Sequence, residues 1–125
     1  MACSHFRVAV VDDDESVRKA LARLLRASGY EVEVFVGGGE FLDSLKAGKS
    51  DCVVLDVHMP MVSGLSVQEM LRASGEYVPI IFMTAYDDDT LREEALAKGA
   101  VAYLRKPLTE KTLLTAIAKV ANTKN

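Results

Sequence analysis

Four apolar stretches of this chain end at side chains that suit the handling of a phosphoryl group. Asp12 and Asp13 follow the first stretch, Asp56 follows the second, Thr84 the third and Lys106 the fourth. Carboxylates bind divalent cations and can act as nucleophiles, a lysine neutralises negative charge, and a hydroxyl can donate to a phosphoryl oxygen. These residue types predict phosphoryl chemistry, provided that the fold brings them together.

The three acids also predict a metal ion. If the carboxylates of Asp12, Asp13 and Asp56 met, their repulsion would raise at least one pKa unless a cation relieved it. Mg²⁺ is the natural ion, because it prefers oxygen ligands and commonly bridges one or two carboxylates to a phosphate. Asp56 could then attack phosphorus and form an acyl phosphate, while Lys106 neutralises the equatorial oxygens. Thr84 could sense the phosphoryl group through its hydroxyl.

The apolar stretches have the length and composition of buried strands, and a helix-like pattern follows each one. They run from Arg7 to Val11, Cys52 to Leu55, Ile80 to Met83 and Val101 to Leu104. Unbroken apolar strands that alternate with helices indicate a parallel sheet covered on both faces. We therefore expect an α/β, doubly wound fold of five βα units, with its ligand site at the carboxyl ends of the strands.

The other elements follow from periodicity and from glycine and acid positions. An amphipathic helix is predicted from Ser16 to Ala27, ending at Gly29, and the alternation from Val32 to Val36 predicts a strand near a sheet edge. The run Gly37 to Gly39 predicts a permissive turn that leads into a short helix. That helix carries Phe41, Leu42 and Leu45. Later helices are expected over 65–73, from Asp88 or Asp89 to Lys98, and from Thr109 or Glu110 to beyond Val120.

Length and composition limit the class of protein. A chain of 125 residues, half of them apolar, fits one domain with its own core, and a net charge of -3 argues against a nucleic-acid surface. The two cysteines, Cys3 and Cys52, do not form a disulfide framework. No apolar run reaches the roughly 20 residues of a membrane helix, and the first residues lack the layout of a signal peptide. A reducing cytoplasm is the expected location.

The stretch from about Phe6 to Val120 resembles the receiver domain of bacterial two-component response regulators. The matching motifs are Val11-Asp12-Asp13, Leu55-Asp56-Val57-His58-Met59-Pro60 with Gly64, Thr84-Ala85 and Lys106-Pro107. The resemblance implies a flavodoxin-like (βα)5 fold with strand order 2-1-3-4-5. It also implies one receiver domain over residues 1–125, with a core of about 6–120.

The resemblance assigns a role to each residue. Asp56 looks like the phosphoacceptor, which takes its phosphoryl group from a phosphohistidine on a sensor histidine kinase. Asp13 and Asp56 look like Mg²⁺ ligands, with Asp12 helping through water and the backbone carbonyl of His58 as a further ligand. Lys106 looks like the lysine that contacts the phosphoryl group, in a Lys-Pro bond that is typically cis. Thr84 and Tyr103 look like paired switch residues.

As a hypothesis, phosphorylation draws Thr84 toward the phosphoryl group, lets Tyr103 turn inward and reshapes the face formed by 88–98, 101–104 and 109–121. A downstream output domain or partner protein would bind that face, and phosphorylation-dependent homodimers are one outcome. No direct contact with nucleic acid or membrane is expected of this domain. The pattern is most similar to regulators whose output is DNA binding, and both a stand-alone regulator and an excised receiver fit the chain.

Other interpretations compete with this one. Taken singly, Asp12 to Glu15 reads as a helix start, Asp56 as a turn, and Lys106 as a solvated lysine. Only their joint placement reverses that reading. An aspartyl-phosphate phosphatase would carry a second acid two residues after the nucleophile, where this chain has His58. A flavin carrier would need a glycine-rich loop of backbone donors where the acids stand, and would be yellow. The chain is therefore expected to be a switch, not an enzyme, apart from its own phosphorylation and autodephosphorylation.

Overall fold

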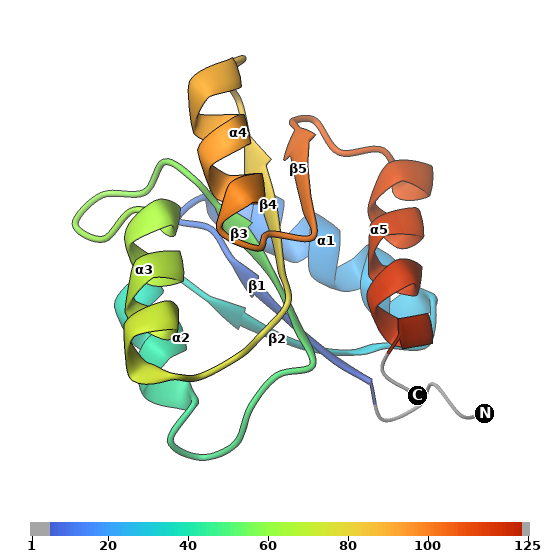
Figure 1. Ribbon diagram of the computed structural model, residues 1–125. Helices are drawn as coiled ribbons and strands as arrows, with labels where there is room; N and C mark the ends of the chain where they lie inside the picture. Colours follow the sequence, from blue (N-terminus) through green and yellow to red (C-terminus); the bar gives the residue numbers. More distant parts are fainter. Residues whose placement is uncertain (1–5, 124–125) are drawn as a thin grey trace.

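Strands and helices alternate along the whole of residues 6–123, which the computed structural model describes (Figure 1). The ten elements are β1 (Arg7–Val11), α1 (Glu15–Ala27), β2 (Glu31–Phe35), α2 (Gly38–Ser44), β3 (Cys52–Asp56), α3 (Gly64–Ser74), β4 (Ile80–Thr84), α4 (Asp89–Ala97), β5 (Ala102–Arg105) and α5 (Glu110–Thr123). Cys3 lies outside the described residues, and Cys52 is a buried free thiol. No helix in the described range is long and apolar enough to cross a bilayer.

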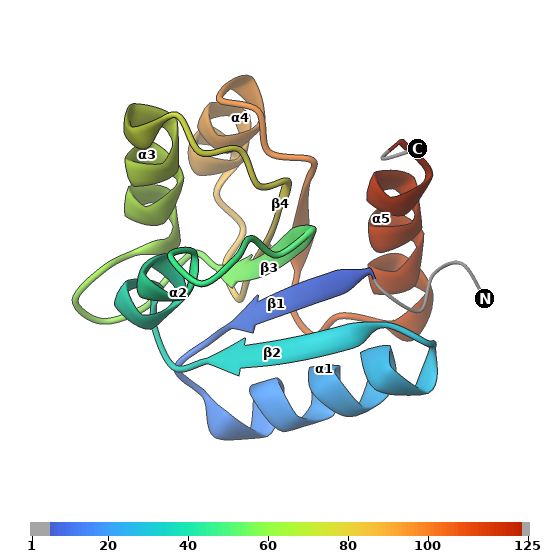
Figure 2. The ribbon, with the colours of Figure 1, turned by 90° about the horizontal axis from the view of Figure 1, so that it is seen from below.

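The strands form one parallel sheet in the order β2-β1-β3-β4-β5. This order confirms the predicted flavodoxin-like, doubly wound fold, and it confirms that the strand with the alternating valines lies at an edge. The order reverses between β1 and β3, which is where open sheets of this type form a ligand crevice. Figure 2 shows the arrowheads of β1, β2 and β3 pointing the same way, so their carboxyl ends share one edge of the sheet.

The core lies in two layers because neighbouring side chains of a strand point to opposite faces. On β1, Val8 and Val10 pack with α1 and α5, whereas Ala9 and Val11 pack against α2, α3 and α4. All residues of β3 and β4 are buried, as expected for strands covered on both faces. The sheet therefore gives firm support to the residues at the carboxyl ends of its strands.

Side-chain caps and glycines set the ends of the helices. Asp14 caps α1 by accepting from the Ser16 backbone N–H, and Asp88 caps α4 by accepting from that of Leu91. Gly29, Gly75 and Gly99 follow α1, α3 and α4 with positive φ angles, a conformation that glycine adopts without strain. These stops agree with the sequence predictions to within one or two residues.

Several predicted boundaries differ from the structure: β2 begins one residue earlier than predicted, and β3 and β4 each end one residue later. The glycine run is not only a turn, because α2 begins inside it at Gly38, where a Cβ would lie 2.5 Å from Cγ2 of Val67 on α3. Glycine there lets α2 and α3 approach closely. The last strand begins at Ala102, one residue later than predicted, although the Val101 backbone N–H already donates to the Ile80 carbonyl of β4 at 2.8 Å. Local pattern shows neither feature, because both depend on a neighbouring element.

Candidate functional site

The register of the sheet brings the predicted site residues together. Val11 lies beside Leu55, so Asp12 and Asp56 leave adjacent strands side by side. Thr84 pairs with Arg105, and the backbone N–H of Lys106 donates to the Thr84 carbonyl at 2.7 Å. Four strands therefore deliver their last residues to one edge of the sheet, as the sequence predicted.

The acids form a cluster that is suited to a hard cation. Asp12, Asp13 and Asp56 each offer a carboxylate oxygen, and these oxygens lie within 4.8 Å of one another. Asp12 is fully buried and Asp56 is 4% exposed, while Asp13 faces solvent. Oxygen donors partly open to water fit Mg²⁺, which keeps several waters when it binds carboxylates. The donor set thus fits the predicted ion.

Asp12 is already held by protein groups. Its Oδ1 accepts from the Asp14 backbone N–H at 2.8 Å, its Oδ2 accepts from Lys106 Nζ at 2.8 Å, and its backbone carbonyl accepts from Arg18 at 2.8 Å. Both carboxylate oxygens therefore have a protein donor. The water-mediated role of Asp12 at a metal ion stays a prediction.

Lys106 lies between the two buried acids. Its Nζ is 3.5 Å from Asp56 Oδ1 and closer to Asp12. Burial alone would lower the pKa of Lys106, but the hydrogen bond to Asp12 and the charges of Asp56 and Asp12 raise it above its usual value. The ammonium group therefore stays charged beside the acids.

The surroundings of Asp56 disfavour its ionised form. Burial and the negative charge of Asp12 raise the pKa of Asp56, while Lys106 and the backbone N–H of His58 oppose that shift. A carboxylate in this position is short of positive charge. A metal cation or the electrophilic phosphorus of a phosphoryl group would supply the positive charge that the protein groups do not.

Thr84 is buried, and its hydroxyl contacts the loop that follows β4. The hydroxyl accepts from the Tyr86 backbone N–H at 3.1 Å and donates to the Tyr86 carbonyl at 3.3 Å. The Tyr86 ring packs edge-on against the His58 ring, with centroids 5.0 Å apart. The loops after β3 and β4 therefore meet through the residues two positions beyond Asp56 and Thr84. Nothing in the sequence pattern indicated Tyr86.

Tyr103 lies on the α3 and α4 side of the sheet. Its ring is half-buried, with its centroid 6.0 Å from that of Phe82. Its hydroxyl is buried and has no hydrogen-bond partner among the described residues. Burial and the charge of Asp88 raise the pKa of Tyr103; the Thr84 hydroxyl opposes that shift, although the two hydroxyls do not meet hydrogen-bond geometry. The inward rotation stays a prediction, and the ring already lies partly inside.

Two further features support the site. A Cβ on Gly64 would lie 2.4 Å from the backbone oxygen of Asp56, so only glycine lets α3 begin directly against β3. The Lys106-Pro107 peptide bond is cis, as expected.

Arg105 connects the loop after β4 to the end of β5. It forms an ion pair of 2.7 Å with Asp87 and donates to the Ala85 carbonyl. A lone arginine at the end of a strand carried no signal for this contact.

Comparison with known proteins agrees with the geometry. Residues 8–118 match the family described as the response regulator receiver domain. The response regulator protein TodT of Pseudomonas putida is 40% identical over 110 residues, which are 88% of this chain and 48% of TodT. The response regulator MprA of Mycolicibacterium vanbaalenii is 44% identical over 108 residues, 86% of this chain and 47% of MprA.

The solved structures agree as well. The crystal structure of a response regulator receiver protein from Burkholderia phymatum is 47% identical, with a TM-score of 0.81 over 93% of this chain and 94% of that one. The chain spans about half the length of the curated relatives it matches. The acid cluster at the crevice between β1 and β3, the strand order and these matches place the chain in the response regulator receiver domain family.

Proposed function

We propose that this chain is a cytoplasmic phosphoacceptor switch, in which Asp56 takes a phosphoryl group from a phosphohistidine on a sensor histidine kinase. The observation that carries the proposal is the position of Asp56, a buried carboxylate at the crevice of the sheet that lies 3.5 Å from Lys106 Nζ and beside Asp12 and Asp13. We take residues 1–125 as one receiver domain with a core of about 6–120. The regulatory role is that of a signalling domain and not of an enzyme with a turned-over substrate.

The transfer proceeds by displacement at phosphorus. A carboxylate oxygen of Asp56 forms the new P–O bond while the P–N bond of the donor breaks, and the donor imidazole keeps the electron pair and takes up a proton. Lys106, whose charged form the buried acids favour, neutralises the oxygens of the transferred group. The raised pKa of Asp56 means that charge compensation decides how readily it reacts.

Mg²⁺ would be held by Asp13, Asp56 and the backbone carbonyl of His58, with Asp12 acting through water. When bound, it supplies positive charge that offsets the repulsion among the acids and the charge of the phosphoryl oxygens. Asp13 is the acid open to solvent, so it is the side from which the ion and the donor approach. The His58 ring, two residues after Asp56, packs edge-on against the Tyr86 ring of the loop that follows Thr84.

Thr84 and Tyr103 report the modification. To donate to a phosphoryl oxygen, the Thr84 hydroxyl must give up the Tyr86 carbonyl, which loosens the loop before α4. Tyr103, whose buried hydroxyl has no hydrogen-bond partner within residues 6–123, then turns further inward and alters the face formed by α4, β5 and α5. An output domain, a partner protein or a second copy of the domain binds that face.

The test is intact-mass measurement after incubation with acetyl phosphate and Mg²⁺. We expect the wild-type protein to gain the mass of one phosphoryl group, and neither Asp56→Asn nor the wild type with a metal chelator to gain it. Lys106→Met should accept the group much more slowly. Phosphorylation of Asp56→Asn to the wild-type extent would disprove the assignment of the acceptor.

A further inference from the structure

The fourth helix is held to the sheet by very little apolar surface. Within Asp89–Ala97, which the structure describes throughout, Ala95 is the one buried residue, and Leu91 packs only partly against the core. By contrast, α3 buries Val67 and Leu71. Hydrophobic stabilisation scales with buried apolar area, so packing alone holds α4 weakly. Other contacts must contribute to its position.

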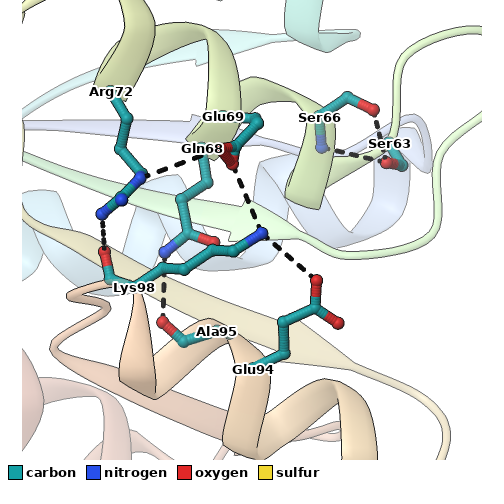
Figure 3. Close-up of polar contacts among 8 residues, drawn as sticks. All are labelled: Ser63, Ser66, Gln68, Glu69, Arg72, Glu94, Ala95 and Lys98. Atoms are coloured by element: carbon teal, nitrogen blue, oxygen red, sulfur yellow. Dashed lines mark hydrogen bonds and ion pairs between the residues drawn. The ribbon is translucent and has the colours of Figure 1, made fainter.

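Those contacts come from polar side chains of α3 (Figure 3). Gln68, which is 2% exposed, donates from Nε2 to the Ala95 carbonyl at 3.1 Å. Arg72 donates to the Lys98 carbonyl at 3.2 Å. The Ala95 carbonyl also accepts from the Ala100 backbone N–H at 3.1 Å, so Gln68 adds a second donor to it, and Arg72 adds a donor to the Lys98 carbonyl just beyond the end of α4. The two helices are joined at the end of α4 that is remote from the site.

An ion network on the surface completes the connection. Lys98 Nζ lies 3.3 Å from Glu69 on α3 and 3.2 Å from Glu94 on α4, and the hydrogen bonds to Glu94 and Glu69 raise the pKa of Lys98. Arg72 pairs with the same Glu69 at 3.8 Å. We use the name α3–α4 clamp for the whole set. It consists of Gln68, Glu69, Arg72, Glu94, the Ala95 carbonyl and Lys98.

The clamp is not explained by stability alone. The Oε1 atom of Gln68 is buried and has no hydrogen-bond partner among the described residues. Leaving a buried acceptor without a partner is unfavourable, and an apolar side chain of similar length would avoid it. Next to Gln68, Arg72 and Lys98 lies an open cleft of about 480 Å³, so apolar packing does not fill the space that the clamp spans.

The other end of α4 is joined to the site. The loop from Thr84 to Asp88 connects β4 to α4, with the Thr84 hydroxyl bonded to Tyr86 and Asp87 paired with Arg105. A change at Thr84 therefore acts on the first turn of α4, while the clamp restrains the last turn. A helix held mainly at its two ends, with little buried surface between them, can shift as one body.

We propose that the α3–α4 clamp sets the resting position of α4 and thereby how readily phosphorylation of Asp56 moves it. This inference rests on the proposed function. The clamp favours the unphosphorylated arrangement, so breaking it raises the population of the shifted arrangement. By linkage it also raises the affinity of the site for a phosphoryl group. Losing one or two contacts of this kind changes such an equilibrium roughly threefold to tenfold.

The experiment uses Gln68→Met, which removes the buried amide at similar length, and Arg72→Met, which removes the exposed contacts with the Lys98 carbonyl and Glu69. Lys19→Met is the matched control, because it breaks an exposed pair with Glu15 on α1 at 3.1 Å. Amide hydrogen exchange across α4 and the binding of beryllofluoride, a phosphoryl analogue, with Mg²⁺ are measured for each. We expect both clamp variants to exchange faster in α4 and to bind the analogue about threefold to tenfold more tightly, with the control unchanged.

The outcomes separate the two proposals. If the wild type does not bind the analogue at all, the proposed function fails. If it binds, but neither clamp variant differs from it by more than about twofold in affinity, the clamp has no role in signalling even where exchange in α4 rises. Weaker binding in both variants would reverse the sign of the proposal and overturn it.

Discussion

The helices α1 and α4 both begin a few residues after a site residue, and they are fastened in opposite ways. Helix α1 follows Asp12, buries three residues in the core and sends Arg18 back to the Asp12 carbonyl. Helix α4 follows Thr84, buries Ala95 and is otherwise held by polar contacts at its ends. The part of the site that precedes α1 and carries the acids is thus firmly packed. The part that precedes α4 and carries Thr84 is held by contacts that small changes can break.

Core truncations should show this difference most strongly. Leu25 on α1 is fully buried, so Leu25→Ala should lower the free energy of unfolding by about 3 kcal/mol. Leu91→Ala on α4 should lower it by about 1 kcal/mol, since Leu91 is only partly buried. Urea unfolding of both variants at one pH measures the contrast. Equal losses would show that α4 is as firmly packed as α1.

A second substitution tests how closely α3 packs against the end of β3, beside Asp56. Gly64→Ala would place a Cβ 2.4 Å from the Asp56 backbone oxygen, so we expect a loss of roughly 1 to 3 kcal/mol. Gly39→Ala is the control, since no atom lies within 4 Å of its added Cβ and alanine favours a helix. Thermal unfolding should show a fall for the first variant and no fall for the second. If both behave alike, the close approach of α3 to β3 is not rigid.

Without a metal ion, the negative charge of Asp56 should lower the free energy of unfolding. Because burial and Asp12 raise the pKa of Asp56 in the folded protein, its ionisation destabilises the fold. That loss is absent below the ordinary pKa of 3.8, grows as the pH rises from there to the raised pKa of the folded protein, and is complete above it. In a metal-free buffer at pH 7, Asp56→Asn should therefore melt a few degrees higher than the wild type, where 1 kcal/mol is roughly 4 °C.

The pH dependence and the metal dependence check that reading. The difference in melting temperature between Asp56→Asn and the wild type should shrink as the pH falls toward the ordinary pKa of 3.8, because Asp56 takes up its proton at a higher pH in the folded protein than in the unfolded chain. Mg²⁺ should stabilise the wild type more than the variant. Differential scanning fluorimetry across pH, with and without Mg²⁺, measures both trends. If the difference in melting temperature between the two proteins did not change with pH, packing and not charge would be its cause.

The smallest effect is expected in the loop that connects β4 to α4. Arg105→Gln removes the pair with Asp87, and because both side chains are largely exposed, the free energy of unfolding should change by less than about 1 kcal/mol. Exchange of the Tyr86 backbone N–H, which donates to the Thr84 hydroxyl, should nevertheless become faster. Hydrogen exchange measured by NMR, with Arg7→Gln as a control on an exposed pair in β1, would detect it. No change at Tyr86 would mean that Arg105 does not hold the loop.

Much of the fold and the membership of the site could be predicted from the sequence. Asp12, Asp56, Thr84 and Lys106 each follow an apolar stretch, and the register of parallel strands then makes them neighbours. The two adjacent acids could not be told apart in the same way. Asp12 is fully buried and accepts from Lys106, which follows β5, whereas Asp13 faces solvent.

Some residues gave no local signal at all. Gln68 lies among the buried residues of an amphipathic helix, yet its partner is the Ala95 carbonyl, which lies 27 residues away. Tyr86 reads as an ordinary loop residue until its ring meets that of His58. Such contacts join separate βα units, and periodicity carries no information about the distance between units.

The sequence by itself determined the kind of fold, the edge of the sheet where chemistry gathers and the residue types there, because alternation of apolar strands and helices allows few arrangements. Only the tertiary structure decided which acid is buried, which carboxylates the Lys106 ammonium approaches and how α4 is held. Those outcomes depend on distances between segments remote in the chain, and burial, charge and capping act through such distances.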